Sequence, residues 1–342
     1  MLRAVHRLAM LRTVDGIDLC RAGASAFRVR FFGARIPLAA RIQVTRRCTS
    51  RCVYCRLPDE SGDPLGARQI LSILDELASL GCLRVSLSGG EPMLRKDIGW
   101  IVDACAALGM VPEMNTSGYG MADRIDEVRR LGLVKISLDG PEEIHDAVRG
   151  RAGSYREVLA AARAARSAGI RIVLVATITR HNVDHLDHIL ETACDLGVLA
   201  AFQPVKPYYK GLADVDAILP EPGRMREAID RLARACRGGQ SARMRNSLRG
   251  LEHIRSWPEY GRLRCWAGRI FCIVGADGTL YPCDRTRIDT ALPNCLDGGV
   301  GEALGRLPEP DCDGCGFCGA LELNLAMAMD HRVASTISRL VG

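Results

Sequence analysis

Between residues 41 and 204, short apolar runs alternate with longer segments whose apolar residues recur every three or four positions. The short runs predict strands, and the longer segments predict amphipathic helices. The predicted strands cover residues 41–45, 83–87, 111–115, 134–138, 171–177 and 200–203. The predicted helices between them cover residues 67–80, 97–108, 122–131, 154–168 and 183–196.

A glycine stands between each predicted helix and the strand after it, where helices commonly end. This repeated strand–helix order predicts an α/β fold whose parallel strands are joined by crossover helices. Six strands are two fewer than a closed eight-stranded barrel needs. We therefore expect a partial (β/α)6 barrel, open on one side.

The sequence divides into four segments by composition. Residues 1–40 form a lead-in with a predicted basic helix near its start, and residues 41–219 form the predicted barrel. Residues 220–260 predict an arginine-rich helical connection, and residues 261–342 are rich in cysteine and end in a predicted helix over 321–340.

Composition narrows the function classes. The net charge of +6 is spread along the chain and aromatic residues make up 5%, so a nucleic-acid partner is not expected. Fifteen cysteines, many of them clustered, favour metal or iron–sulfur binding in a reducing compartment over disulfides. The chain lacks a signal-peptide core and a membrane-spanning run, which predicts a cytoplasmic protein. Membrane contact is not expected, although a membrane-surface helix near the N-terminus stays open.

Three cysteines follow the first predicted strand directly: Cys48, Cys52 and Cys55 are spaced C-x3-C-x2-C. Three thiolates at this spacing can hold three corners of a small metal cluster and leave one metal open for chemistry. A zinc knuckle is the competing interpretation, but a closed zinc site needs four ligands, and no fourth Cys or His lies nearby. The next strand ends in a second distinctive loop, Gly89-Gly90-Glu91-Pro92.

Polar residues also follow the later predicted strands. In barrel folds the chemistry is carried by the loops at the carboxyl ends of the strands, so we expect these side chains to face one site. Ser137 and Asp139 are two positions apart and should point the same way. The other residues in this set are Asn115, Ser117, Arg149 and Gln203.

With its CxxxCxxC and GGEP loops, the chain resembles the radical S-adenosylmethionine (SAM) enzymes over residues 41–205. The resemblance implies that a [4Fe–4S] cluster binds SAM through its open iron and that SAM is cleaved to methionine and a 5′-deoxyadenosyl radical. That radical abstracts a hydrogen atom from the substrate. An electron donor such as flavodoxin or ferredoxin is implied as a partner.

The resemblance also implies roles for individual residues. Cys48, Cys52 and Cys55 would bind the cluster, and Tyr54 would pack near the adenine. Gly89 and Gly90 would let the backbone approach the methionine part of SAM, and Glu91 would accept from its ammonium group. The implied roles of the remaining residues are ribose contacts for Ser137 and Asp139, a carboxylate contact for Arg149, SAM or substrate contacts for Asn115 and Ser117, and an adenine cover for Gln203.

The cysteines after residue 261 resemble the auxiliary-cluster extension called SPASM, or its shortened form, twitch. Asp277-Gly278 predicts a hairpin turn between Cys265 and Cys283. The resemblance implies an auxiliary [4Fe–4S] cluster bound by Cys265, Cys283 and two of Cys312, Cys315 and Cys318. Cys272 and Cys295 are spare thiols or ligands of a second cluster. A structural zinc site is the competing interpretation of this set.

The substrate is not specified by any motif. We expect an oxidation or bond-forming step on a small metabolite, completed with help from the auxiliary cluster. A peptide maturase acting on a ribosomally made peptide is the second hypothesis; it ranks lower because only about forty residues precede the first strand, too few for a peptide-recognition domain. An enzyme that acts on a lipid or isoprenoid substrate is a third hypothesis, and a non-catalytic iron–sulfur sensor is a fourth.

Overall fold

The computed structural model describes residues 16–55, 57, 65–206, 216–238, 243–283, 291–310, 312 and 314–330. The predicted basic helix near the start of the chain and the end of the predicted final helix lie outside these residues. Among the residues that are described, none of the helices has the length and apolar character needed to cross a membrane.

Eight strands form one sheet in the order β6-β5-β4-β3-β2-β1-β7-β8. All neighbouring pairs are parallel except β7 and β8, which form an antiparallel hairpin. The expectation of an open, partial barrel of parallel strands is confirmed, because the sheet does not close on itself. The strands are β1 (Ala39–Thr45), β2 (Arg84–Gly89), β3 (Val111–Thr116), β4 (Leu133–Ser137), β5 (Arg171–Ile178), β6 (Leu199–Pro204), β7 (Phe271–Val274) and β8 (Leu280–Tyr281).

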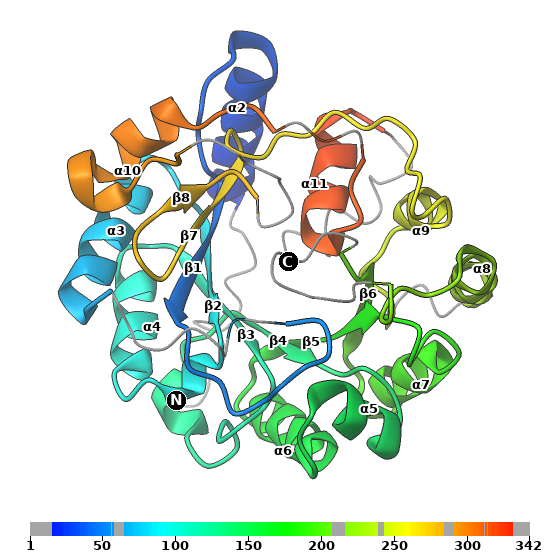
Figure 1. Cartoon of the computed structure of the whole chain (residues 1–342). Helices are drawn as coiled ribbons and strands as arrows, with labels where there is room; N and C mark the ends of the chain where they lie inside the picture. The colour runs from blue at the N-terminus through cyan, green and yellow to red at the C-terminus, as the bar shows by residue number, and fades with distance from the viewer. Residues whose placement is uncertain are drawn as a thin grey trace.

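Helices cover the outer side of this curved sheet (Figure 1). The helices are α2 (Gly16–Phe32), α3 (Ala67–Ser79), α4 (Ile98–Ala107), α5 (Glu142–Arg149), α6 (Ser154–Ser167), α7 (Leu186–Leu196), α8 (Pro222–Arg237), α9 (Leu248–Ile254), α10 (Cys295–Arg306) and α11 (Cys318–Met327). Two predictions were wrong in this region. The helix expected over 122–131 is only a short 3-10 turn, η3 (Ile125–Val128), and α5 was not expected at all.

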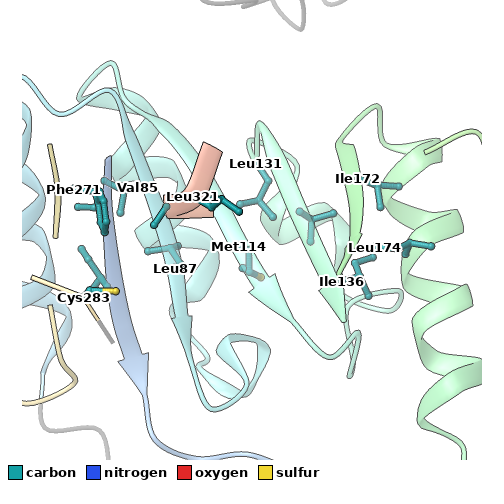
Figure 2. Close-up of a cluster of buried hydrophobic side chains, with 14 of the residues drawn as sticks. Val85, Leu87, Met114, Leu131, Ile136, Ile172, Leu174, Phe271, Cys283 and Leu321 are labelled. Atoms are coloured by element: carbon teal, nitrogen blue, oxygen red, sulfur yellow. The ribbon is translucent and has the colours of Figure 1, made fainter. Parts of the chain in front are cut away.

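Side chains alternate between the two faces of each strand. On the helix-facing side, Val85, Leu87, Met114, Ile136 and Leu174 are almost completely buried and pack side by side across β2 to β5 (Figure 2). The residues between them on the strands face the inside of the curve and are mostly polar, as described below. An apolar outer face and a polar inner face explain why the barrel can be both stable and hollow.

The cysteine-rich segment joins the barrel sheet directly. Strand β7 pairs in parallel with β1, with Ala39 opposite Phe271 and Ile42 opposite Val274. Helix α11 lies at the opening of the sheet, between β7 and β6 (Figure 1). The boundary drawn at residue 261 stays a prediction, but the strand that carries the three-cysteine loop is hydrogen-bonded to a strand from beyond that boundary.

Candidate active site

The loop that carries Cys48, Cys52 and Cys55 leaves β1 and is fixed by the end of α5. The backbone N–H of Arg51 donates to the carbonyl of Arg149 at 2.9 Å, and that of Val53 donates to Val148 at 3.0 Å. Gly150 ends α5 with a φ of +61°, and a Cβ there would lie 2.5 Å from the Arg51 carbonyl oxygen. The missed helix α5 is therefore the support on which the cysteine loop rests.

The three thiols suit a metal cluster. Burial raises the pKa of Cys48, and it raises the pKa of Cys52 to about 11, although the guanidinium of Arg149 opposes this and its Nη1 donates to Cys52 Sγ at 3.7 Å. Thiols bind metals in the deprotonated form, and burial disfavours that negative charge when nothing balances it. Bound iron would supply the positive charge that stabilises the thiolates. The buried hydroxyls of Thr49 and Ser50 in the same loop have no hydrogen-bond partner among the described residues, which leaves polar atoms available to a bound group.

The glycine pair after β2 locks the cysteine loop to its neighbour. The N–H of Gly90 donates to the Thr45 carbonyl and that of Glu91 to the Arg47 carbonyl, both at 2.8 Å. A Cβ on Gly89 would lie 2.1 Å from Thr45 O, and one on Gly90 would lie 2.1 Å from Arg47 O. Real Cβ atoms do not approach backbone oxygens so closely, so no other residue fits either position without movement.

Glu91 is completely buried and its carboxylate accepts four hydrogen bonds. Oε1 accepts from Met93 N and from Thr116 Oγ1, and Oε2 accepts from the N and Oγ of Ser117 at 2.7 and 2.6 Å. Burial raises the pKa of Glu91, and the donors counteract that rise. Glu91 and Ser117 thus tie the loops after β2 and β3 together, and their contacts with SAM stay a prediction.

Asp139 is the centre of a buried polar group after β4. Its Oδ2 accepts from Tyr54 Oη at 3.1 Å and lies 2.8 Å from Arg149 Nε, while its Oδ1 accepts from Thr177 N at 3.0 Å. Its own N–H donates to His145 Nδ1 at 3.0 Å. Burial raises the pKa of Tyr54, so the phenol keeps the proton that it donates. This group connects the cysteine loop, β4, β5 and α5.

A cavity of about 280 Å³ lies inside the barrel beside this group. Asn115, Ser137 and Gln203 line it, as expected for polar residues at strand ends. Gln203 Nε2 donates to Thr177 Oγ1 at 3.4 Å, and its Oε1 accepts from the Cys318 thiol at 3.6 Å. Helix α11 therefore closes the open side of the cavity with residues of the cysteine-rich segment.

The predicted auxiliary ligands occupy different surroundings. Cys283 and Cys315 are buried, Cys265 is half-buried and accepts from Asn324 Nδ2 at 3.8 Å, and Cys312 is exposed. Cys265 and Cys312 are close enough to influence each other electrostatically. Within the described part of the chain, no three His, Cys, Asp or Glu side chains surround a single-ion position.

Cys272 lies elsewhere, inside the core. Burial raises the pKa of Cys272 well above the usual value, and the nearby thiols of Cys82 and Cys295 act in the same direction. Cys82 is itself a buried thiol, and a buried thiol commonly packs as a small apolar side chain. The role of Cys272 as a spare thiol or as a ligand of a second cluster stays a prediction.

Sequence reasoning missed three contributors to the site: His145, Thr116 and the carbonyl groups at the end of α5. His145 is buried and burial lowers its pKa to about 4, so it is a neutral acceptor at neutral pH. The sequence did contain an indication of this role. A histidine six residues after Asp139 is near enough along the chain for its side chain to accept a hydrogen bond from the Asp139 N–H. No local signal indicates that Val148 and Arg149 carbonyls would hold a loop from early in the chain.

Comparison with known proteins places this geometry in a family. The family model described as Radical SAM superfamily matches residues 42–193. The PqqA peptide cyclase of Bradyrhizobium diazoefficiens is 30% identical over 270 residues, which cover 75% of this chain and 69% of that protein. The chain belongs to the radical SAM superfamily. Members of this superfamily bind a [4Fe–4S] cluster and SAM, and the SPASM-type members carry auxiliary clusters as well.

Two further similarities cover most of this radical SAM enzyme. The mycofactocin maturase MftC of Mycolicibacterium smegmatis is 28% identical over 306 residues, covering 84% of this chain and 76% of that protein. The crystal structure of Streptococcus suis SuiB bound to S-adenosylmethionine shares the fold, with a TM-score of 0.64 at 15% identity, over 80% of this chain and 67% of that chain.

Proposed function

We propose that this radical SAM enzyme is a maturase that modifies a ribosomally made peptide. The observation that carries the proposal is the similarity over most of this chain to two proteins, a PqqA peptide cyclase over 75% of the chain and the mycofactocin maturase MftC over 84% of it. The sequence alone favoured a small metabolite over a peptide, and these relatives reverse that order. The step on the peptide is proposed to be oxidative or bond-forming, as expected from the auxiliary cysteines.

Cys48, Cys52 and Cys55 are assigned as the ligands of the SAM-binding cluster. The bound cluster and SAM supply reductive cleavage of SAM and abstraction of a substrate hydrogen atom. The chain's own residues position these groups: Arg149 places positive charge beside the Cys52 sulfur, and Gly90, which has no side chain, lets its backbone pack directly against the cysteine loop. Asn115, Ser137 and Gln203 present polar atoms to the cavity in which SAM and the peptide would meet.

Cys265, Cys283, Cys312 and Cys315 are assigned as the auxiliary ligands. Cys312 and Cys315 are preferred over Cys318 because the Cys318 thiol lies against Gln203 in the barrel cavity. An auxiliary cluster on this side would take up an electron from the substrate radical, while flavodoxin or ferredoxin would deliver the electron that starts the reaction. The ligand set is open to test by iron counting, as described below.

Label transfer from a fractionated cell extract tests the substrate class. The reconstituted enzyme is incubated anaerobically with SAM, dithionite and extract from cells grown in deuterated medium, and deuterium in 5′-deoxyadenosine is measured. We expect label from the untreated extract and its loss when the extract has been digested with a protease that is then inhibited. Transfer that survives digestion and follows the small-molecule fraction would instead establish a metabolite as the substrate.

A further inference from the structure

A group of charged side chains occupies the floor of the barrel, at the amino ends of the strands. Arg84 begins β2, and Glu113 and Lys135 are the third residues of β3 and β4. Arg84 Nη1 lies 3.6 Å from Glu113 Oε1, and Lys135 Nζ donates to Glu113 Oε2. Arg245 follows Met244, which is bridged to Ala200 of β6, and its charge also acts on Glu113.

Among the described residues that line the barrel cavity, positive charge exceeds negative charge. Five cationic residues line the barrel cavity (Arg41, Arg84, Lys135, Lys206 and Arg245), and Glu113 is the one acidic residue among its described lining residues. A second cavity of about 320 Å³ lies below and shares Arg84, Glu113 and Arg245 with the first. That cavity adds Arg166, Arg171 and Arg243 to its lining and no further carboxylate among the described residues.

Two carboxylates act on these cations: Glu113 at the floor, and Glu322 of α11, whose charge acts on Arg245. Burial alone would raise the pKa of Glu113, but the charges of Lys135 and Arg84 outweigh it and lower the pKa to about 2. Glu113 is therefore fully ionised at neutral pH, and its single negative charge is already shared between two cations. Burial lowers the pKa of Lys135 and of Arg245 even though Glu113 acts on both and Glu322 on Arg245, so burial of these cations outweighs the negative charge beside them. Bringing a second anion to this position would compensate them.

We propose that the barrel floor around Arg84, Lys135 and Arg245 is a subsite that binds a carboxylate group of the substrate. The inference rests on the proposed peptide substrate, and it requires that this peptide carry a carboxylate close to the residue that reacts. The carboxylate is either an acidic side chain or the C-terminus of the peptide. Guanidinium groups suit such a ligand because their planar fork matches the two oxygens of a carboxylate.

The position of the floor limits which residue reacts. Glu113 and Asn115 are two residues apart on β3, as are Lys135 and Ser137 on β4, so the floor lies about 7 Å along the strands from the polar ends. One extended peptide residue spans about 3.5 Å. A peptide anchored at the floor would therefore place the anchored residue, or one within about two positions of it, beside the strand ends.

Binding of three tripeptides to the wild-type holoenzyme tests the proposal without requiring turnover. The probes are acetyl-Gly-Glu-Gly-amide, which carries a side-chain carboxylate, acetyl-Gly-Gln-Gly, which carries a terminal one, and acetyl-Gly-Gln-Gly-amide, which carries none. Anaerobic calorimetric titration should show saturable binding of at least one of the first two and none of the third. Equal binding of all three, or of none, would overturn the proposal.

Variants of Arg245 test whether the carboxylate probes bind at the barrel floor. Arg245→Gln should weaken carboxylate binding at least about tenfold, because a charged hydrogen bond is lost, and Arg245→Lys should restore part of it. Arg226→Gln removes an exposed cation from α8 and should bind the probe like the wild type. Unchanged binding by Arg245→Gln would show that these cations only neutralise Glu113. If a variant does not fold, the comparison of the three tripeptides on the wild-type holoenzyme still tests the proposal.

The two proposals fail in different ways. Carboxylate-dependent binding together with protease-resistant label transfer would remove the peptide proposal and leave the subsite. Protease-sensitive label transfer without carboxylate-dependent binding would remove the subsite and leave the peptide proposal.

Discussion

Arg149 and Asp139 form a buried ion pair beside the cysteine loop. Arg149 Nε lies 2.8 Å from Asp139 Oδ2, and the two side chains are 9% and 0% exposed. The same guanidinium donates to Cys52 Sγ, and the same carboxylate accepts from Tyr54. One pair of charges therefore sets the position of a predicted cluster ligand and of the aromatic residue beside it.

Replacing Asp139 by Asn should leave the Arg149 charge buried without its counter-ion. We expect the free energy of unfolding to fall by about 3–5 kcal/mol and SAM affinity to fall with it, measured by anaerobic denaturant titration and by SAM binding. Asp126→Asn breaks an exposed pair with Arg129 and should cost no more than about 0.5 kcal/mol. Equal losses in the two variants would contradict the importance of the buried pair.

Iron content separates the two sets of cysteine ligands. Wild-type protein reconstituted anaerobically should hold about eight iron atoms if it carries two four-iron clusters. Changing Cys48, Cys52 and Cys55 together to Ala should remove about four of them and abolish 5′-deoxyadenosine formation. Changing the exposed Cys20 to Ala should alter neither quantity. Continued SAM cleavage by the triple variant would contradict the ligand assignment.

Cys283→Ala tests the auxiliary cluster by itself. It should remove about four iron atoms, spare SAM cleavage and impair substrate turnover. Cys318→Ala is the matched comparison, because its thiol faces Gln203 and should leave the iron content at the wild-type value. A loss of iron in Cys318→Ala would mean that Cys318 is a ligand and takes the place of Cys312 or Cys315 in the proposed set.

Gly90→Ala should disrupt the contact between the loops after β1 and β2. The added Cβ would lie 2.1 Å from the Arg47 backbone oxygen, so the cysteine loop must shift. We expect a loss of about 2–4 kcal/mol in the free energy of unfolding and a lower iron content. Gly223→Ala in α8 has no atom within 4 Å of the new Cβ and should be neutral or raise stability by up to about 1 kcal/mol. Similar stability of the two variants would count against the close approach.

His145 should make stability depend on pH. Burial lowers its pKa from 6.5 to about 4, so the unfolded chain binds a proton between these values that the folded protein does not. The histidine therefore weakens the folded state as pH falls, by about 1 kcal/mol between pH 6.5 and 5.5. His145→Asn keeps an acceptor for Asp139 N–H and should remove that part of the pH dependence, measured by denaturant titration at both pH values. An identical pH dependence in the variant would contradict a neutral His145.

The sequence was most informative where the structure is local. Each of the six predicted barrel strands is present with ends within two residues of the prediction, because apolar runs and helix-ending glycines act over a few positions. The helix at Glu142–Arg149 was missed because it is short and follows Asp139-Gly140-Pro141, which favours a turn. The helix expected near Ile125–Val128 shows the opposite error, since spacing alone does not set helix length.

Contacts between distant segments could not be predicted in the same way. The motifs placed Tyr54, Asp139 and Arg149 in one site, but nothing in their spacing indicates that they bond to one another. The hairpin at Asp277-Gly278 was expected, whereas its pairing with β1 was not. Strand pairing over long separations depends on the packing of the whole chain, which local patterns do not encode.

The pairing of β1 with β7 has a consequence for synthesis of the protein. Residues 39–42 exchange hydrogen bonds with residues 271–274, so β1 remains an unprotected edge until most of the chain has left the ribosome. An unprotected edge strand is an aggregation hazard, and such late contacts slow folding. Strand β1 is thus among the first parts made, but it gains β7 as a neighbour only late, which makes C-terminal truncation harmful to the barrel itself.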